Sequence, residues 1–248
     1  MIETHPKITI VTVTFNAAAV LEKTMLSVIN QTYNAVEYII VDGGSTDGTI
    51  EIIKKHENRL FHWISEPDKG IYNAMNKGIR LATGDWICFM NAGDAFADNT
   101  IIQKVVDELD AADIIYGDIL IENADGAYRE KIAKEPCNLH KMYFSHQSAF
   151  AKTALLRQYP FDEQYKICAD YKFFKQCAHA HCQFKHVRFP VAVFDMSGIS
   201  SMQRENARHE NVAIIKELDK GWDKFVFLVH LYFAIYWKKL SSRDQVRW

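Results

Sequence analysis

Residues 82–94 read Ala-Thr-Gly-Asp-Trp-Ile-Cys-Phe-Met-Asn-Ala-Gly-Asp, and the fold is decided by this stretch. Its Thr-Gly pair is typical of a turn, residues 86–90 are apolar and predict a buried strand, and a polar tip ends in Asp94. Open α/β sheets bind ligands at the carboxyl ends of their strands. Asp94 is therefore a candidate for a metal or phosphate contact, whereas the alternative is that Asp94 or Asp98 caps a helix that begins near Asn99.

Three further strands precede this one, each followed by a helical pattern. Residues 8–14 are all β-branched and predict a buried parallel strand. Residues 36–42 and 61–65 predict the second and third strands, and residues 49–55, capped by Ser45 or Thr46, predict a helix between them. This alternation predicts an α/β fold, with a mostly parallel, Rossmann-like sheet that is covered by helices on both faces.

Four polar loops follow these strands, and the carboxyl ends of parallel strands meet at one edge of a sheet. The loops expected to converge are 14–16, 42–45, 66–70 and 91–94.

The second half of the sequence is less regular. An Asn-Ala-Asp-Gly turn at 123–126 predicts a hairpin. Pro190 predicts a break between two strands, because proline cannot donate to a ladder. The remaining expected elements are a strand at 148–151 and helices at 169–177, 203–218 and 222–240.

Composition narrows the class of protein. With 248 residues and 48% hydrophobic content, the chain can bury one large α/β core or two small ones. Its formal net charge of −2 argues against nucleic acid as a partner, because such binding needs a concentrated basic face. The five cysteines are odd in number and scattered, which favours a reducing compartment. No signal-peptide pattern precedes the first strand, so a cytoplasmic location is expected.

Five motifs, in this order along the chain, resemble those of the inverting glycosyltransferases of family 2, which have the nucleotide-sugar-binding GT-A fold. The motifs are Val-Thr-Val-Thr-Phe-Asn (11–16), Val-Asp-Gly-Gly-Ser-Thr-Asp-Gly-Thr (41–49), Ser-Glu-Pro-Asp-Lys-Gly-Ile-Tyr-Asn-Ala-Met-Asn-Lys-Gly (65–78), Gly-Asp-Trp-Ile-Cys-Phe-Met-Asn-Ala-Gly-Asp (84–94) and Ala-Asp-Tyr (169–171). The resemblance implies a GT-A domain over residues 1–200, with a nucleotide-binding half at 1–100 and an acceptor half at 101–200. Residues 201–248 are expected to form a C-terminal helical extension.

The resemblance implies a nucleotide-sugar donor, with UDP as the expected nucleotide. In the family, the residue that matches Asp42 hydrogen-bonds the base, while residues that match Thr14, Asn16 and Asp68 enclose the nucleoside. Asn91 is expected on the donor side as well. The alternative for Asp42 is an Asx turn at the strand end.

The resemblance also implies a divalent cation, Mg²⁺ or Mn²⁺. Residues 91–94 match an acidic metal motif in which two adjacent carboxylates are common. Here Gly93 replaces the first carboxylate, and Asp94 is expected to be the direct ligand. One carboxylate is enough in principle, because phosphate oxygens and water complete the shell of such cations.

Asp170 matches the family's catalytic base, which takes the proton from the acceptor hydroxyl during a single in-line displacement. The alternative is that Asp170 is the N-cap of the helix that follows. His146 and Gln147 match a His-Gln pair and are expected on the acceptor or diphosphate side, whereas a structural role for His146 is equally open.

The expected function is metal-dependent, inverting transfer of a hexosyl or N-acetylhexosaminyl group to a saccharide or lipid-linked saccharide, in cell-surface polysaccharide or O-antigen synthesis. One alternative is a non-catalytic nucleotide-sugar-binding protein, which Gly93 leaves open. A sugar nucleotidyltransferase is disfavoured, because residues 15–19 offer neither glycine nor positive charge for a triphosphate.

The C-terminal segment contains an apolar run at 225–237 that is too short to span a bilayer. Basic residues flank this run, as in a helix that lies in a membrane interface. Peripheral contact with the inner face of the plasma membrane is therefore expected, and the alternative is a helix docked on the core or on the second subunit of a homodimer.

Overall fold

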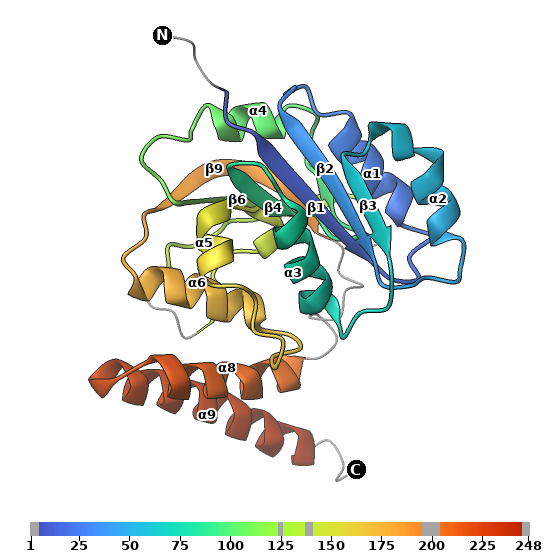
Figure 1. The fold of residues 1–248 in the computed structure, drawn as a ribbon. Helices are drawn as coiled ribbons and strands as arrows, with labels where there is room; N and C mark the ends of the chain where they lie inside the picture. Colours follow the sequence, from blue (N-terminus) through green and yellow to red (C-terminus); the bar gives the residue numbers. More distant parts are fainter. Residues whose placement is uncertain (1–4, 124–125, 137–140, 195–203, 245–248) are drawn as a thin grey trace.

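The computed structural model describes residues 5–123, 126–136, 141–194 and 204–244. Within these residues, one sheet of nine strands has the order β3-β2-β1-β4-β8-β6-β9-β5, with β7 paired on β6. Helices cover both faces of the sheet, and two C-terminal helices lie beside one another below the body (Figure 1). The α/β fold expected from the sequence is therefore confirmed.

The first four strands of the sheet order are parallel, as predicted. They are β1 (Ile8–Thr14), β2 (Val36–Asp42), β3 (His62–Ser65) and β4 (Trp86–Phe89). Every residue of β1 is buried, because this strand lies between β2 and β4 and has helices on both faces. Side chains on alternate residues of β1 enter two different cores, one on each face of the sheet.

Two layers of helices form these cores. The helices are α1 (Leu21–Ile29), α2 (Thr49–Lys55), α3 (Ile71–Leu81), α4 (Ile101–Val106), α5 (Thr153–Gln158) and α6 (Ala169–His179). Buried residues of α1, α2 and α4 belong to one core, and those of α3, α5 and α6 to the other. Helix α3 lies very close to β1, because a Cβ on Gly78 would be 2.4 Å from a methyl group of Val11.

The second half of the sheet mixes directions. Its strands are β5 (Ala95–Phe96), β6 (Ile114–Glu122), β7 (Tyr128–Lys131), β8 (Ala149–Lys152) and β9 (Phe184–Phe194), and short 3₁₀ turns cover Glu57–Arg59 (η1) and His146–Ser148 (η2). Strands β6 and β7 form the predicted hairpin. Strand β8 is antiparallel to both β4 and β6, so the parallel arrangement stops where η2 and β8 enter the sheet.

Two local predictions are wrong, and so is the alternative that Asp94 caps a helix. The strand around Pro190 is continuous, because a register shift opposite Gly117 and Asp118 accommodates the missing amide. Neither Ser45 nor Thr46 caps α2, which begins after Gly48. Asp94 caps no helix, because α4 begins only at Ile101.

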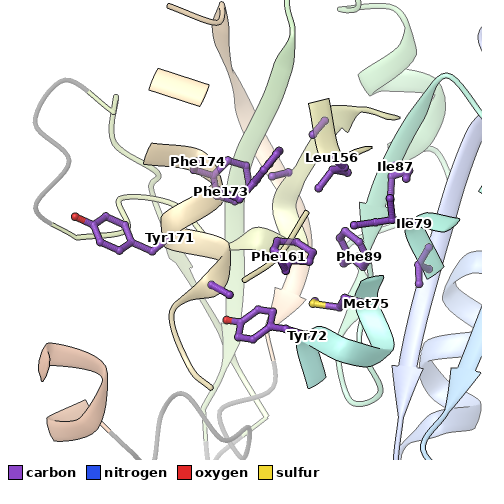
Figure 2. Packing of buried hydrophobic residues seen from close by; sticks show 14 of the residues in the cluster. Tyr72, Met75, Ile79, Ile87, Phe89, Leu156, Phe161, Tyr171, Phe173 and Phe174 are labelled. Carbon is purple, nitrogen blue, oxygen red and sulfur yellow. The ribbon is translucent and has the colours of Figure 1, made fainter. Parts of the chain in front are cut away.

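An aromatic cluster joins the parallel strands to α6 (Figure 2). The Phe161 ring lies 5.4 Å from Tyr72 of α3, 5.3 Å from Phe89 of β4 and 5.8 Å from Phe173 of α6, measured between ring centroids. These contacts bury large apolar surfaces in defined geometries and fix α3 relative to α6.

The C-terminal helices are α8 (Arg204–Leu218) and α9 (Gly221–Asp244). Helix α8 joins the body, because Ile214 is buried in the same core as α3 and α6, and the Lys175 ammonium of α6 lies 2.8 Å from the Asp219 carboxylate. Helix α9 packs on α8. Among the described residues, no helix combines the length and apolar character that crossing a membrane requires.

Candidate active site

A cavity of about 380 Å³ opens at the carboxyl edge of the parallel strands. Its walls come from the end of β1, the loop before α3, the loop after β4, η2 and the start of α6. Seven of the side chains predicted from the sequence line it, namely Thr14, Asp68, Asn91, Asp94, His146, Gln147 and Asp170. Residues as far apart as Thr14 and Asp170, which are 156 positions apart, therefore meet in one site. Three of the four loops predicted to converge line the cavity, and residues 42–45 do not.

Asp42 and Asn16 do not line this cavity. The Asp42 carboxylate is fully buried and accepts hydrogen bonds from the backbone N–H groups of Gly44 and Ser45 and from the Ser65 hydroxyl. In this structure the carboxylate is held by its own loop, as in an Asx turn, and does not face the cavity. The base contact expected of Asp42 stays a prediction.

Asn16 joins two loops and does not line the cavity. Its side-chain Oδ1 accepts from the Thr46 N–H, and its own N–H donates to the Ser45 hydroxyl. The residue adopts a φ of 48°, a left-handed conformation that asparagine tolerates better than most residues. Asn16 therefore shapes the loop that carries Thr14 and Phe15 into the cavity.

Two buried polar atoms of the cavity wall lack a partner. Thr14 Oγ1 and Asn91 Oδ1 make no hydrogen bond to any described residue, although both are buried. Buried polar atoms in folded proteins are almost always paired, so such an atom calls for an explanation. Because both residues line the same cavity, a polar ligand in that cavity explains them together.

Asp170 is held by three hydrogen bonds. Its Oδ1 accepts from the Tyr171 N–H (2.8 Å) and lies 2.9 Å from the Tyr72 hydroxyl, whose proton it shares with the Ile167 carbonyl oxygen at 2.7 Å. Its Oδ2 lies 3.1 Å from His146 Nδ1. Burial, and then the negative charge of Asp170, raise the pKa of Tyr72 well above 10. The Tyr72 hydroxyl therefore keeps its proton and remains a donor. Asp170 is not the N-cap of α6, because Cys168 occupies that position.

His146 bridges Asp170 and the loop after β4. Its Nε2 lies 3.0 Å from the Asn91 amide nitrogen, which is a donor. Nε2 must then accept, so the ring proton is on Nδ1 and donates to Asp170 Oδ2. The imidazole ring is thus fixed from both sides and connects the two carboxyl-bearing parts of the site.

Asp94 faces the cavity from the tight turn after β4. Its Oδ2 accepts from the Gln147 amide at 2.9 Å. The turn depends on Gly93, which has a φ of 104° and donates its N–H to the Thr24 hydroxyl. A residue with a side chain is strained in that conformation.

The described residues contain no group of three or more His, Cys, Asp or Glu side chains that could hold a metal ion. A metal centre built by protein ligands alone therefore does not fit this site. A cation that takes most of its ligands from a bound diphosphate and water does fit, because Asp94 supplies one hard oxygen ligand at the cavity wall.

Sequence reasoning missed several residues of the cavity wall. The Phe15 ring is 62% exposed at the mouth, and Tyr72 and Lys166 line the cavity as well. The Lys166 ammonium donates to the backbone carbonyl of Glu163 at 2.8 Å, and Lys166 also lines a second cavity of about 230 Å³ next to the first. Phe15 and Tyr72 lie within recognised motifs, which could have pointed to them, whereas no sequence signal pointed to Lys166.

Helix α8 holds the loop that leads into α6. The Glu210 carboxylate accepts hydrogen bonds from three consecutive backbone N–H groups, those of Lys166 (2.8 Å), Ile167 (3.0 Å) and Cys168 (2.9 Å). Two of these residues line the cavity, and Asp170 follows two positions later. The C-terminal part of the chain therefore supports the site directly.

Residues 9–168 match the family described as glycosyl transferase family 2. This match covers more than half of the chain, which therefore belongs to that family and is a glycosyltransferase.

Individual relatives agree with this assignment. A PGL/p-HBAD biosynthesis glycosyltransferase of Mycobacterium tuberculosis is 31% identical over 181 residues, which are 69% of this chain and 70% of the relative. An uncharacterized glycosyltransferase of the same species is 29% identical over 214 residues, which are 82% of this chain and 80% of the relative.

Solved structures share the fold. S. aureus TarS 1–349 in complex with UDP-GlcNAc has a TM-score of 0.71 at 18% identity, over 91% of this chain and 71% of that one. The mannosyltransferase PcManGT of Pyrobaculum calidifontis in complex with GDP-Man and Mn²⁺ has a TM-score of 0.69 at 18% identity, over 93% and 70% of the two chains. At these identities the likeness concerns the fold alone.

Proposed function

We propose that this glycosyltransferase transfers a sugar from a UDP-sugar to a hydroxyl group of a saccharide or lipid-linked saccharide, with inversion and with a divalent cation. The observation that carries the proposal is the meeting of Thr14 Oγ1, Asn91 Oδ1 and three carboxylates, those of Asp68, Asp94 and Asp170, in one cavity. A nucleotide sugar offers the hydroxyl groups, base edges and phosphates that such a wall can bind.

The donor's nucleoside is assigned to the end of the cavity formed by β1 and the loop before α3. There the exposed Phe15 ring offers an aromatic surface, and Thr14 Oγ1 and Asp68 offer hydrogen-bonding atoms. The Asp68 carboxylate also lies over Gly43, where an added Cβ would be 2.5 Å from its Oδ2. Gly43 thus leaves room for the Asp68 carboxylate beside Phe15, which favours Asp68 for a base-side role.

The donor's diphosphate is assigned to the side of Asp94. Mg²⁺ or Mn²⁺ bound there would neutralise charge on the departing diphosphate. Asp94 is the proposed protein ligand, and Gln147 orients its carboxylate. TarS was solved with UDP-GlcNAc, and PcManGT with GDP-Man and Mn²⁺, which favours the same class of donor and cation for this chain.

Asp170 is the proposed catalytic base, and its hydrogen bonds favour Oδ2 as the atom that accepts the proton. Oδ1 already accepts two hydrogen bonds and Oδ2 accepts one, so the lone pair left for the acceptor's proton is on Oδ2. As the acceptor oxygen forms its bond to the anomeric carbon, the bond from that carbon to the diphosphate oxygen breaks. The hydroxyl proton passes to Asp170 Oδ2.

Tyr72 and His146 are proposed positioning residues. Neither is assigned contact with the reacting atoms, but each holds one oxygen of Asp170, and His146 is itself held by Asn91. A base that is fixed from both sides needs no reorganisation when the acceptor arrives.

The proposed acceptor is based on the second cavity, and the proposed biological role is based on a named relative. The second cavity, which shares Tyr72 and Lys166 with the first, is the proposed entry for a saccharide. The mycobacterial relative is named for PGL/p-HBAD biosynthesis. We assign this chain to the assembly of a cell-surface saccharide, of which O-antigen is one example.

Calorimetric titration tests the donor assignment. The purified protein is titrated with UDP-, GDP- and dTDP-sugars, each with Mn²⁺ and again with EDTA. We expect binding of UDP-sugars that EDTA weakens. Failure of a folded protein to bind any of them would overturn the proposal, and metal-dependent binding without transfer to any acceptor would favour the non-catalytic alternative that Gly93 leaves open.

A further inference from the structure

Helix α9 has two apolar faces. One face packs on α8, where Phe227, Leu231 and Ile235 are buried. The other face is a row of six large apolar side chains, each between 48 and 75% exposed. This row, the aromatic stripe, consists of Trp222, Phe225, Val229, Tyr232, Phe233 and Tyr236. At about 100° per residue, these positions fall on one side of the helix, and most neighbours in the row are three or four residues apart.

We propose that the aromatic stripe binds the surface of an anionic lipid bilayer, with α9 lying in the plane of the membrane. Contiguous exposed apolar surface of this kind marks interaction sites. The helix lies on the bilayer and does not enter it fully, because its opposite face is committed to α8. The inference rests on the proposed function only for the kind of acceptor that a membrane would present.

The residue types of the stripe suit a lipid surface. Trp222, Tyr232 and Tyr236 combine an apolar ring with a polar tip, which is the combination enriched at membrane interfaces. Phe225 and Phe233 lie among them and would enter the acyl boundary. From residue 222 to residue 236 the helix extends about 21 Å, so several rings would insert together.

Charge favours an anionic bilayer as the occupant. Residues 221–248 contain five lysines and arginines but two aspartates, in a chain of net charge −2. The Lys216 ammonium of α8 lies 5.7 Å from the centroid of the Tyr232 ring and borders the stripe. Basic residues beside an apolar helix face attract anionic headgroups. A second copy of the chain fits less well, because a two-fold interface would bring two such positive segments together.

The location of the stripe suits the proposed reaction. Helix α8 lies between α9 and the body (Figure 1). Through Glu210, α8 holds Lys166 and Ile167, which line both cavities. A membrane bound at the stripe would therefore lie on the side of the molecule where a lipid-linked acceptor would reach the site.

Vesicle flotation tests the proposal. The full chain is mixed with phosphatidylcholine vesicles that contain or lack phosphatidylglycerol. We expect binding to the anionic vesicles, and a drop of about tenfold or more in the partition coefficient for the double variant Trp222→Ser, Phe225→Ser. The matched control is Tyr128→Ser, an exposed aromatic residue on β7, which should bind as the parent does. Circular dichroism checks that each variant is folded.

Three results would overturn the proposal. They are absence of binding to any vesicle, equal binding by the double variant, and a dimer in solution that the double variant dissociates, which would make the stripe a contact between copies. Donor titration on the same preparations separates the two proposals. A protein that binds UDP-sugars but no vesicle loses only the lipid contact, and one that binds vesicles but no nucleotide sugar loses only the proposed transfer.

Discussion

The side chain of Asp170 is the sharpest test at the scale of single residues. Asp170→Asn keeps the size of the side chain but removes the carboxylate that would accept the proton. We expect kcat to fall roughly a hundredfold to ten-thousandfold, with the dissociation constant of the donor unchanged. Steady-state kinetics and calorimetry measure the two effects. Asp107→Asn, at the exposed end of α4, is the control, and near-normal turnover of Asp170→Asn would remove the assignment.

A substitution at Tyr72 distinguishes the orientation of Asp170 from the general stability of the fold. Tyr72→Phe removes the hydroxyl that lies 2.9 Å from Asp170 Oδ1. We expect kcat to fall about tenfold while KM for the donor is unchanged, because the base is less well oriented but the donor wall is intact. Tyr38→Phe is the control, since Tyr38 is a buried tyrosine bonded to Thr12 outside the cavity. Equal kcat losses in both variants would point to a general loss of structure.

Substitution of Asp94 tests whether its carboxylate binds the metal ion. Asp94→Ala should weaken Mn²⁺-dependent donor binding about tenfold or more, and should leave the weaker binding in EDTA unchanged. Asp98→Ala is the matched control, because Asp98 is close in sequence but its carboxylate bonds Thr100 and lies outside the cavity. If both variants bind the donor equally well with Mn²⁺, Asp94 is not the ligand.

At the scale of elements, Glu37 joins the amino-terminal edge of the parallel strands. Its buried carboxylate accepts from the N–H of Thr83 and from the hydroxyl groups of Thr83 and Thr9. Burial alone would raise the pKa of Glu37, but these hydrogen bonds and the Lys7 ammonium lower it below its ordinary value of 4.5. The carboxylate therefore stabilises the folded state above pH 4.5, and this stabilisation is lost as the pH falls through the lowered pKa.

The substitution Glu37→Gln tests this pH dependence. We expect the free energy of unfolding to fall by about 2 kcal/mol at pH 7, because fewer hydrogen bonds to a charged acceptor remain. The difference from the parent protein should shrink in acid as Glu37 itself becomes protonated. Urea unfolding at pH 7 and in acid, below the pKa of Glu37, measures this difference in the free energy of unfolding. The exposed Glu57→Gln is the control. A difference that grows in acid would contradict the sign.

At the scale of the whole molecule, the C-terminal helices are coupled to the site through Glu210. Glu210→Ala leaves three backbone N–H groups of residues 166–168 without their acceptor. We expect kcat to fall about tenfold, because this loop leads directly to Asp170, and the free energy of unfolding to fall by about 1–3 kcal/mol. Glu205→Ala, an exposed glutamate of the same helix, is the control. Unchanged turnover would show that α8 does not support the site.

The domain boundary at residue 200 stays a prediction.

The sequence by itself determined the parallel half of the sheet, and it pointed to seven residues that line one cavity and whose roles stay predictions. It could do so because a buried strand, a glycine turn and an amphipathic helix each leave a local pattern, and because parallel strands end at one edge. Asn16 and Asp42 lie outside that cavity, because a position at a strand end does not reveal whether a side chain faces the cavity or bonds its own loop.

Only the tertiary structure decided the partners of these side chains. The bonds from Tyr72 and His146 to Asp170 join residues 98 and 24 positions apart, and Glu210 reaches the loop at 166–168 across more than 40 positions. The two faces of α9 are equally apolar in sequence, and packing on α8 alone separates the buried face from the exposed one. Contacts between distant segments depend on how whole elements pack, and no local pattern records them.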